Sequence, residues 1–309
     1  MIVAIVTLVI FLSFLLANCL YKKSNYYYNV NFDYNSLKKI DNKYAIVNLG
    51  STYAKYAFGT YNELKIEGKS FALEGQSLYG DVYVLLNYLR NIKHNGIVII
   101  PLAACVMLYD NHYNIEYLRR KHIINMFPLL QNPKLIKKII FDDTVIFHSV
   151  YGKCSSSLDS NEKETVLNNL EQVWIKLFDL KDLKNDVLSE KNIVNIEKNI
   201  NYIKQLLNIC QSNNLRPVII VMPFSSRLVS KFSKGFLNKV LYEPIKMVVD
   251  EGNVLLLDYL ANDKFYNSPE LFIDGGFRLN KRGSKIFVKA FVNDIENHDA
   301  GVKEYENIG

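Results

Sequence analysis

The stretch Tyr44-Ala45-Ile46-Val47-Asn48-Leu49-Gly50-Ser51-Thr52 decides the fold prediction. A mostly apolar run ends at Leu49 and meets Gly-Ser, and the following residues, 53–58, can start a helix. A serine between a buried strand and a helix lies where open α/β sheets bind their ligands, at the carboxyl ends of the strands. A Gly-Ser pair is also an ordinary turn and helix cap, and on this pair alone the ordinary interpretation is the stronger one.

The same alternation continues along the chain. Apolar runs typical of strands lie at 44–49, 70–73, 97–101, 217–222 and 254–258, and helical periodicity lies at 81–93, 193–211, 236–250 and 284–295. The runs 97–100 and 218–221 are continuously apolar, which is typical of strands covered on both faces. The sequence therefore predicts an α/β fold, a three-layer α/β/α parallel sheet of flavodoxin-like type.

The N-terminal segment, residues 1–20, is almost wholly apolar and is long enough for one membrane-spanning helix. A cleaved signal peptide is the competing interpretation, but a positive n-region is missing and no clear cleavage site is present. The quartet Leu16-Ala17-Asn18-Cys19 is faintly similar to a lipoprotein box, in which Asn18 is a poor fit. Lys22 and Lys23 follow the segment and favour, by the positive-inside rule, a cytoplasmic domain.

The predicted organisation has four parts: a membrane anchor at 1–20, a spacer at 21–43, an α/β domain at 44–296 and a polar tail at 297–309. Residues 105–190 are rich in Tyr, His, Lys and Asn and break the strand–helix alternation. They are interpreted as a helical insertion above the carboxyl edge of the sheet.

Charge and cysteine content exclude several function classes. The formal net charge is +6, and the lysines are spread along the 309 residues without an aromatic-interleaved basic stripe, so nucleic-acid binding is not expected. The four cysteines are scattered, with no Cys-x-x-Cys pair, so neither a disulfide framework nor a zinc site is predicted. The pair Asp142-Asp143 has no partner ligands nearby, and no metal or cofactor is predicted.

Three blocks carry a resemblance to a known family. They are Asn48-Leu49-Gly50-Ser51-Thr52, then Glu74-Gly75-Gln76-Ser77-Leu78-Tyr79-Gly80-Asp81, then the segment from Pro269 through Asp274 to Gly283. In this order they resemble the SGNH/GDSL hydrolase superfamily. The closer resemblance is to its membrane-anchored DltD-like branch, which is found beside bacterial envelope and polysaccharide genes. The resemblance spans residues 44–295, with the insertion weakly covered.

The resemblance implies roles for individual residues. Ser51 would be the nucleophile that accepts an acyl group, and Asp274 the acid of the triad. The amides of Ser51 and Gly75 would stabilise the oxyanion. Gln76, Arg278 and Asn280 would contact the oxyanion or the substrate. The same resemblance places the globular domain outside the cytoplasm and names an envelope polysaccharide or an acyl-donor protein as its partner.

The sequence departs from the family where a histidine should stand. That position holds Arg278 in one alignment and Phe277 in the other, and neither side chain can accept a proton from serine. The family's oxyanion Asn is also absent from residues 99–103, which follow a predicted strand. His94 would lie at the wrong end of the sheet and His298 in the tail, whereas the insertion carries three further histidines: His112, His122 and His148.

Two functions therefore remain open. The chain is either an envelope O-acyl esterase or transferase that acts on a glycan or teichoic-type polymer through Ser51, or an inactive relative that binds a polymer or partner. An anchored structural protein without a binding site is a weaker third alternative. In both main alternatives Ser51 is predicted to lie beside the segment 274–280. Because the terminal block offers Phe277 and Arg278 in place of a histidine, weak or no hydrolysis of simple esters is expected, since a serine without a general base loses about 10²–10⁴-fold in rate. Robust turnover through Ser51 would instead favour the esterase or transferase.

Overall fold

The structure is a computed structural model that describes residues 2–23, 37, 40–110, 160–252 and 254–306. The chain divides into two compact units, formed by residues 1–40 with 113–156 and by residues 41–112 with 157–309. In the first unit the described part is the helix α1 (Ile2–Lys23) with Leu37 and Ile40. The second unit holds all the described strands.

Helix α1 is continuous, as predicted, and runs three residues past Leu20. Its segment Ile2–Tyr21 is long and apolar enough to cross a membrane, by length and composition. A signal sequence near an N-terminus passes the same test. Ile2 and Val3 at its start are about three-quarters exposed, whereas Asn18 and Tyr21 near its end are buried.

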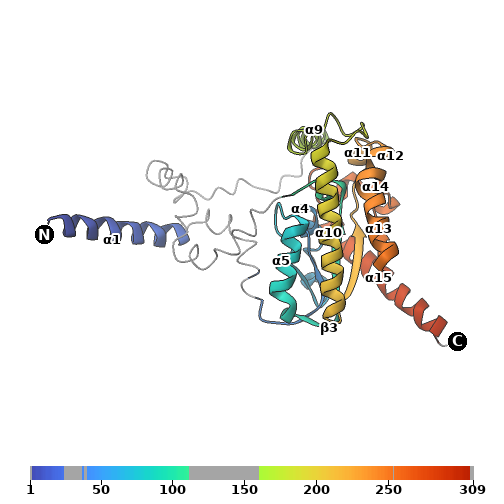
Figure 1. Ribbon diagram of the computed structural model, residues 1–309, viewed down its shortest axis with the longest axis horizontal. Coiled ribbons are helices and arrows are strands. Elements are labelled where there is room, and N and C mark those ends of the chain that lie inside the picture. Colours follow the sequence, from blue (N-terminus) through green and yellow to red (C-terminus); the bar gives the residue numbers. More distant parts are fainter. Residues whose placement is uncertain (1, 24–36, 38–39, 111–159, 253, 307–309) are drawn as a thin grey trace. The chain divides into compact units, whose positions relative to one another are not determined.

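The second unit is built on a parallel sheet, as predicted (Figure 1). Its described strands lie in the order β2-β1-β3-β4-β5, and every neighbouring pair is parallel. The strands are β1 (Tyr44–Asn48), β2 (Gly68–Ser70), β3 (Ile92–Leu102), β4 (Arg216–Val221) and β5 (Leu255–Asp258). This is the flavodoxin-like strand order, in which the chain reverses direction across the sheet between β1 and β3.

Helices cover both faces of the sheet. On one face α5 (Leu78–Tyr88), α10 (Glu190–Ser212) and α13 (Glu243–Gly252) lie side by side (Figure 1). Elsewhere in the unit α4 (Thr52–Ala57) packs against α15 (Lys281–Glu306), and the Ser284 hydroxyl donates to the Ala57 carbonyl at 2.8 Å. The remaining described helices are α6 (Ala104–Met107), α9 (Ser160–Leu177), α11 (Ser226–Val229), α12 (Lys234–Leu237) and α14 (Asp263–Tyr266), with a π-helical segment at Asn238–Tyr242 and 3-10 turns at Asn62–Leu64, Leu89–Asn91 and Pro269–Leu271.

An aromatic core fixes α4 in place. The Phe58 ring, which follows α4, lies edge-on at 5.3 Å from both Phe287 and Phe291 of α15. All three side chains are buried. Edge-to-face pairs of this kind add to the stabilisation that burial alone gives. Because α4 begins directly after Ser51, the same packing holds the predicted nucleophile in position.

Several boundaries differ from the sequence prediction. The strand β2 is Gly68–Ser70, whereas 70–73 was predicted, because residues 71–73 run past the end of β1 while remaining buried. Strand β3 begins at Ile92, so His94 lies inside it, where the prediction had it precede the strand. The predicted helix 236–250 is divided into α12, the π-helical segment and α13. Helix α15 continues to Glu306, through most of the segment predicted as a polar tail.

Candidate active site

Ser51 lies at the point where the direction of the chain across the sheet changes. It follows β1, whose neighbour is β3, and ligands of such sheets bind in the crevice between these carboxyl ends. Gly50 makes the turn with φ +109°, a conformation that favours glycine. A Cβ there would come within 2.5 Å of Pro101 Cγ and 2.8 Å of Ala54 Cβ. The turn therefore packs directly on the end of β3.

The Ser51 hydroxyl is not engaged as a helix cap, and no base lies in place among the described residues to take its proton. The residue occupies the N-cap position of α4, yet its side chain makes no capping hydrogen bond. It is half-buried, and within the described residues its hydroxyl has no hydrogen-bond partner. A nucleophilic serine needs a base within hydrogen-bond reach, and none is in place there.

The described histidines lie away from Ser51. His94 is near the start of β3, at the amino edge of the sheet. His298 lines a cavity of about 510 Å³ with Arg216 and Leu255, the first residues of β4 and β5, and so lies at the same amino edge. No predicted site residue lines that cavity. The other histidines (His112, His122 and His148) and the pair Asp142-Asp143 lie outside the described residues.

The Asp274 carboxylate is occupied within its own loop. Its Oδ1 accepts hydrogen bonds from the amides of Gly276 (3.2 Å), Phe277 (2.8 Å) and Arg278 (3.0 Å), and its Oδ2 accepts one from Arg278 Nε at 2.9 Å. The side chain is 2% exposed. Asp274 therefore shapes the loop and positions Arg278, and these bonds do not orient a catalytic base.

The terminal block meets the helix that begins after Ser51. The Phe277 ring lies 5.9 Å from the Tyr53 ring, and Arg278 Cζ lies 5.4 Å from the centre of the Tyr56 ring. Both tyrosines belong to α4. Two of the three sequence blocks therefore converge through α4. The side chains that the terminal block brings there are a phenyl ring and a guanidinium group, and neither can act as a base.

The other residues that were predicted to contact the oxyanion or the substrate form hydrogen bonds within the protein. Gly75 is exposed, and its amide donates to Thr52 Oγ1 at 3.3 Å, which brings it beside the residue after Ser51. Gln76 is fully buried, and its side-chain amide donates to Asp81 Oδ1. Asn280 caps α15, because its Oδ1 accepts from the Gly283 amide at 2.9 Å. A direct role of these residues in ligand binding stays a prediction.

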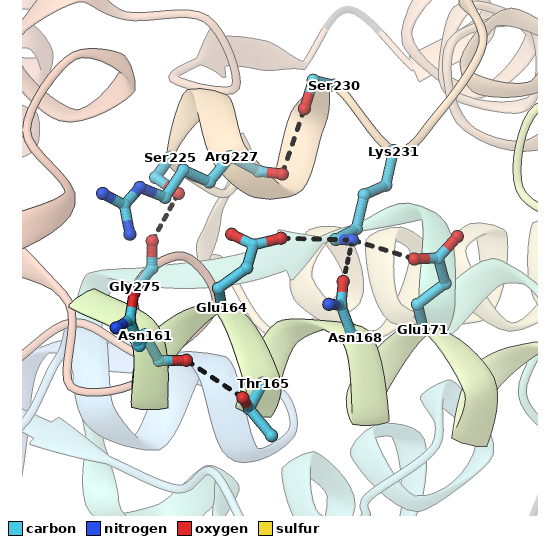
Figure 2. Close-up of polar contacts among 10 residues, drawn as sticks. All are labelled: Asn161, Glu164, Thr165, Asn168, Glu171, Ser225, Arg227, Ser230, Lys231 and Gly275. Atoms are coloured by element: carbon cyan, nitrogen blue, oxygen red, sulfur yellow. Dashed lines mark hydrogen bonds and ion pairs between the residues drawn. The ribbon is translucent and has the colours of Figure 1, made fainter. Parts of the chain in front are cut away.

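Helix α9 lies across the loops that surround the terminal block (Figure 2). Lys231 Nζ donates to Asn168 Oδ1 at 2.6 Å and to Glu171 Oε2 at 2.9 Å, both on α9. Beside them the Ser225 hydroxyl donates to the Gly275 carbonyl at 2.6 Å. The side of the site next to Arg278 is thus built from three segments that are far apart in the sequence.

Trp174 of α9 completes an aromatic cluster around Phe277. Its ring lies 5.2 Å from Phe277 and stacks on Phe232 at 6.0 Å, and Phe224 lies 5.5 Å from Phe277 on another side. Together with Tyr53, these rings surround Phe277, the residue that one of the two alignments predicts in place of a histidine. The sequence signal for this cluster, aromatic residues in four separated segments, has no fixed spacing and could not be recognised in advance.

Sequence reasoning missed Asp81. Its Oδ1 accepts a hydrogen bond from the Gly50 amide at 2.8 Å, directly before Ser51. Burial raises the pKa of this carboxyl to about 7, although the bonds from Gly50 and Gln76 act in the opposite direction. The available signal was an acidic residue in the apolar first turn of a helix. Such residues usually serve the helix terminus alone.

No family model matches the sequence, and no curated protein matches it. Among solved structures, an esterase, EstA, from Pseudoalteromonas sp. is similar at 10% identity, with 82% of this chain and 97% of that chain covered and a TM-score of 0.41. A GDSL-like lipase from Bacteroides thetaiotaomicron is similar at 8% identity, with 89% and 100% covered and a TM-score of 0.43. A protein of Bacteroides fragilis described as a candidate acylhydrolase is similar at 9% identity, with 86% and 94% covered and a TM-score of 0.45. At such low identities and TM-scores, these similarities do not indicate what the Ser51 site does. The chemistry of the site is therefore argued from its own residues.

Proposed function

We propose that this protein is a membrane-anchored, SGNH-like protein of the bacterial cell envelope that binds a glycan or teichoic-type polymer at the Ser51 site without hydrolysing it. Its globular domain lies outside the cytoplasm in this proposal. The observation that carries the proposal is the terminal block, where Asp274 is fully engaged and Phe277 and Arg278 lie against the Ser51 helix. The site thus keeps an accessible serine and places no base beside it among the described residues.

Arg278 indicates the chemistry of the ligand. Its Nε is held by Asp274 at 2.9 Å, its guanidinium lies over the Tyr56 ring, and its side chain is 34% exposed. A guanidinium held in this way recognises carboxylate or phosphate groups through paired hydrogen bonds. An anionic polymer, such as a teichoic acid or an acidic glycan, is therefore favoured over a neutral one.

The binding test uses the full chain in nanodiscs of zwitterionic lipid, with purified lipoteichoic acid and acetylated xylan as the two probes. Trp174, the single tryptophan, contacts Phe277 and serves as the fluorescent reporter. We expect lipoteichoic acid to bind and acetylated xylan to bind more weakly. Arg278→Gln should weaken lipoteichoic acid binding by roughly tenfold, since the loss of one charge-assisted contact is worth about 1.4 kcal/mol.

Two controls make this test specific. Arg90→Gln removes a cation at the start of β3, at the opposite edge of the sheet, and should leave binding unchanged. Ser51→Leu replaces the hydroxyl by a larger apolar side chain and should reduce binding, whereas Ser51→Ala should preserve most of it. The proposal fails if neither polymer binds, or if Arg278→Gln and Ser51→Leu both bind like the native chain.

The second candidate is an O-acyl esterase or transferase with Ser51 as nucleophile. It is favoured by the free Ser51 hydroxyl, and a base would have to come from the undescribed segment with His112, His122 and His148. The assay measures release of 4-nitrophenol from 4-nitrophenyl acetate by the full chain and by Ser51→Ala. We expect no turnover above that of the variant. Robust turnover that Ser51→Ala abolishes would establish the esterase, and His→Gln variants at the three positions would then identify the base.

A further inference from the structure

Asp81 and Gln76 form a buried polar pair beneath the Ser51 turn. Asp81 is 1% exposed in the first turn of α5, and Gln76 is fully buried in the preceding loop. Asp81 Oδ1 accepts two hydrogen bonds, from the Gly50 amide at 2.8 Å and from the Gln76 side-chain amide. The carboxyl therefore connects the second sequence block to the turn that presents Ser51.

Each member of the pair leaves one oxygen without a partner. Asp81 Oδ2 and Gln76 Oε1 are buried, and within the described part of the chain neither has a hydrogen bond. If the carboxyl is ionised, both atoms are acceptors, and a buried acceptor without a donor costs about 1–3 kcal/mol. A proton on Asp81 supplies the missing donor, because a carboxylic acid and a primary amide can form two hydrogen bonds across one pair.

The groups around Asp81 give its charge no compensation. Tyr53 of α4 is the titratable group that interacts electrostatically with Asp81, and Cys105 of α6 in turn interacts with Tyr53. Burial raises the pKa of the Tyr53 hydroxyl well above its usual value and that of the Cys105 thiol to about 12. Both are therefore neutral near pH 7. No cation among the described residues contributes to the shift of the Asp81 pKa, which burial raises to about 7. An ionised Asp81 would be a buried charge without a partner, which is strongly unfavourable.

We infer that Asp81 is a positioning residue that acts in its protonated form: it holds the Gly50 amide and the Gln76 side chain and thereby fixes the turn that carries Ser51. Loss of the proton admits water beside the charge and loosens the turn. Ligand binding at Ser51 therefore weakens as the pH rises through neutrality, a consequence that rests on the proposed function. The positioning role itself does not depend on which ligand binds.

The pH dependence of stability has a defined sign. The native pKa of Asp81 is about 7, above the ordinary value of 3.8 that applies to the unfolded chain. Between these two values the native state keeps a proton that the unfolded state has lost, so the contribution of Asp81 to stability falls as the pH rises from about 4 to about 7. Above that range both states are ionised and the contribution stays constant.

The decisive variant is Asp81→Asn, which imitates the neutral acid by placing a carbonyl acceptor and an NH₂ donor group in the same shape. Urea unfolding of the full chain in detergent micelles is followed by Trp174 fluorescence at pH 5.5 and pH 8.5. The native chain should unfold at a lower urea concentration at pH 8.5 than at pH 5.5, and Asp81→Asn should remove most of this difference. At pH 8.5 the variant should be the more stable protein.

Asp274→Asn is the matched control, because Asp274 is also a buried aspartate beside the site. It accepts three backbone amides and Arg278 Nε, so the substitution should lower the urea midpoint at both pH values. Asp81→Leu removes the acceptor for Gly50 and should also lower both midpoints. If Asp81→Asn is less stable than the native chain at pH 8.5 as well as at pH 5.5, the carboxylate form holds the turn and the inference is wrong.

Two further measurements keep the inference open to refutation if a variant does not fold. Infrared difference spectra of the native chain should show the carbonyl stretch of a protonated carboxyl at pH 6 and its loss by pH 8.5; a spectrum without this change refutes the inference. Lipoteichoic acid affinity should fall by at most tenfold per pH unit above pH 7, since one proton is involved, and be flatter in Asp81→Asn. If this probe binds at no pH, the proposed function fails, while unfolding and infrared data still decide the role of Asp81.

Discussion

Gly50 is the residue that makes the Ser51 turn. Its φ of +109° and the close approach of Pro101 leave no room for a side chain, and its amide is bound by Asp81. The serine is therefore positioned by its predecessor and by groups that approach from two other segments. The position of the Ser51 hydroxyl therefore depends on the backbone conformation at Gly50.

Replacement of Gly50 by alanine should be strongly destabilising. The Cβ would overlap Pro101 and Ala54, and the backbone would be strained, so we expect a loss of roughly 2–4 kcal/mol in the free energy of unfolding. Urea unfolding of the full chain, followed by Trp174 fluorescence, measures this loss. Gly59→Ala is the control, because a Cβ there meets nothing closer than 3.4 Å. Equal midpoints for Gly50→Ala and the native chain would contradict the prediction.

The sequence predicted part of the site at this scale. The Ser51 turn could be located because an apolar run, a glycine and a serine are contiguous. The roles of Gln76 and Asn280 could not, because each is set by how its own block folds back on itself: Gln76 donates to Asp81, five residues on, and Asn280 Nδ2 donates to the Glu270 carbonyl, ten residues back. Local sequence does not reveal whether a polar side chain points inward or toward a ligand.

Helix α9 shows how an element from the predicted insertion contributes to the site. It is amphipathic, with Leu167 and Trp174 buried, and it contacts the loops after β4 and before α15. Residues 105–190 lack the strand pattern and were predicted as a helical insertion of the α/β domain, with no sequence signal for the loops that this helix contacts. Its position follows from contacts between segments about 60 residues apart.

Lys231 should be the polar residue that holds α9 in place. It is 14% exposed and bonds to Asn168 and Glu171, so Lys231→Met should weaken α9 docking by roughly 1–2 kcal/mol. Faster amide hydrogen exchange in α9 and a changed Trp174 emission would report this. Lys239→Met is the control, because its ion pair with Asp186 is about half exposed and should contribute little. Unchanged exchange in α9 would show that the aromatic contacts alone hold it.

Strand positions were more predictable than strand ends. The continuous apolar runs of β3 and β4 arise because both faces of a central strand are covered, and this pattern is visible in the sequence. The ends depend on regular backbone geometry: β2 ends at Ser70, although Phe71 and Leu73 are buried and their amides donate to the carbonyls of Asn48 and Gly50. The strand therefore ends where the regular ladder ends, and hydrophobicity does not report that point.

For the whole molecule, membrane attachment should depend on α1. Because Ile2–Tyr21 is apolar and long enough to span a bilayer, we expect the full chain in the membrane fraction after alkaline carbonate extraction and a chain lacking residues 2–23 in the soluble fraction. Mass spectrometry of the N-terminus is the accompanying measurement, since a mature protein that begins at Cys19 or beyond would show a cleaved signal sequence instead. Protease added to intact cells should digest the α/β unit if this unit lies outside the cytoplasm.

The order of the strands in the sheet has a consequence for synthesis on the ribosome. Strands β1, β2 and β3 are complete by Leu102, but β4, which covers the free edge of β3, begins only at Arg216. At about 5–20 residues per second, the apolar edge of β3 would stay uncovered for roughly 6–23 s. An exposed apolar strand edge is a template for pairing with other chains. The nascent chain is therefore most exposed to aggregation in this interval, and a chaperone that shields the edge should raise the yield of folded protein.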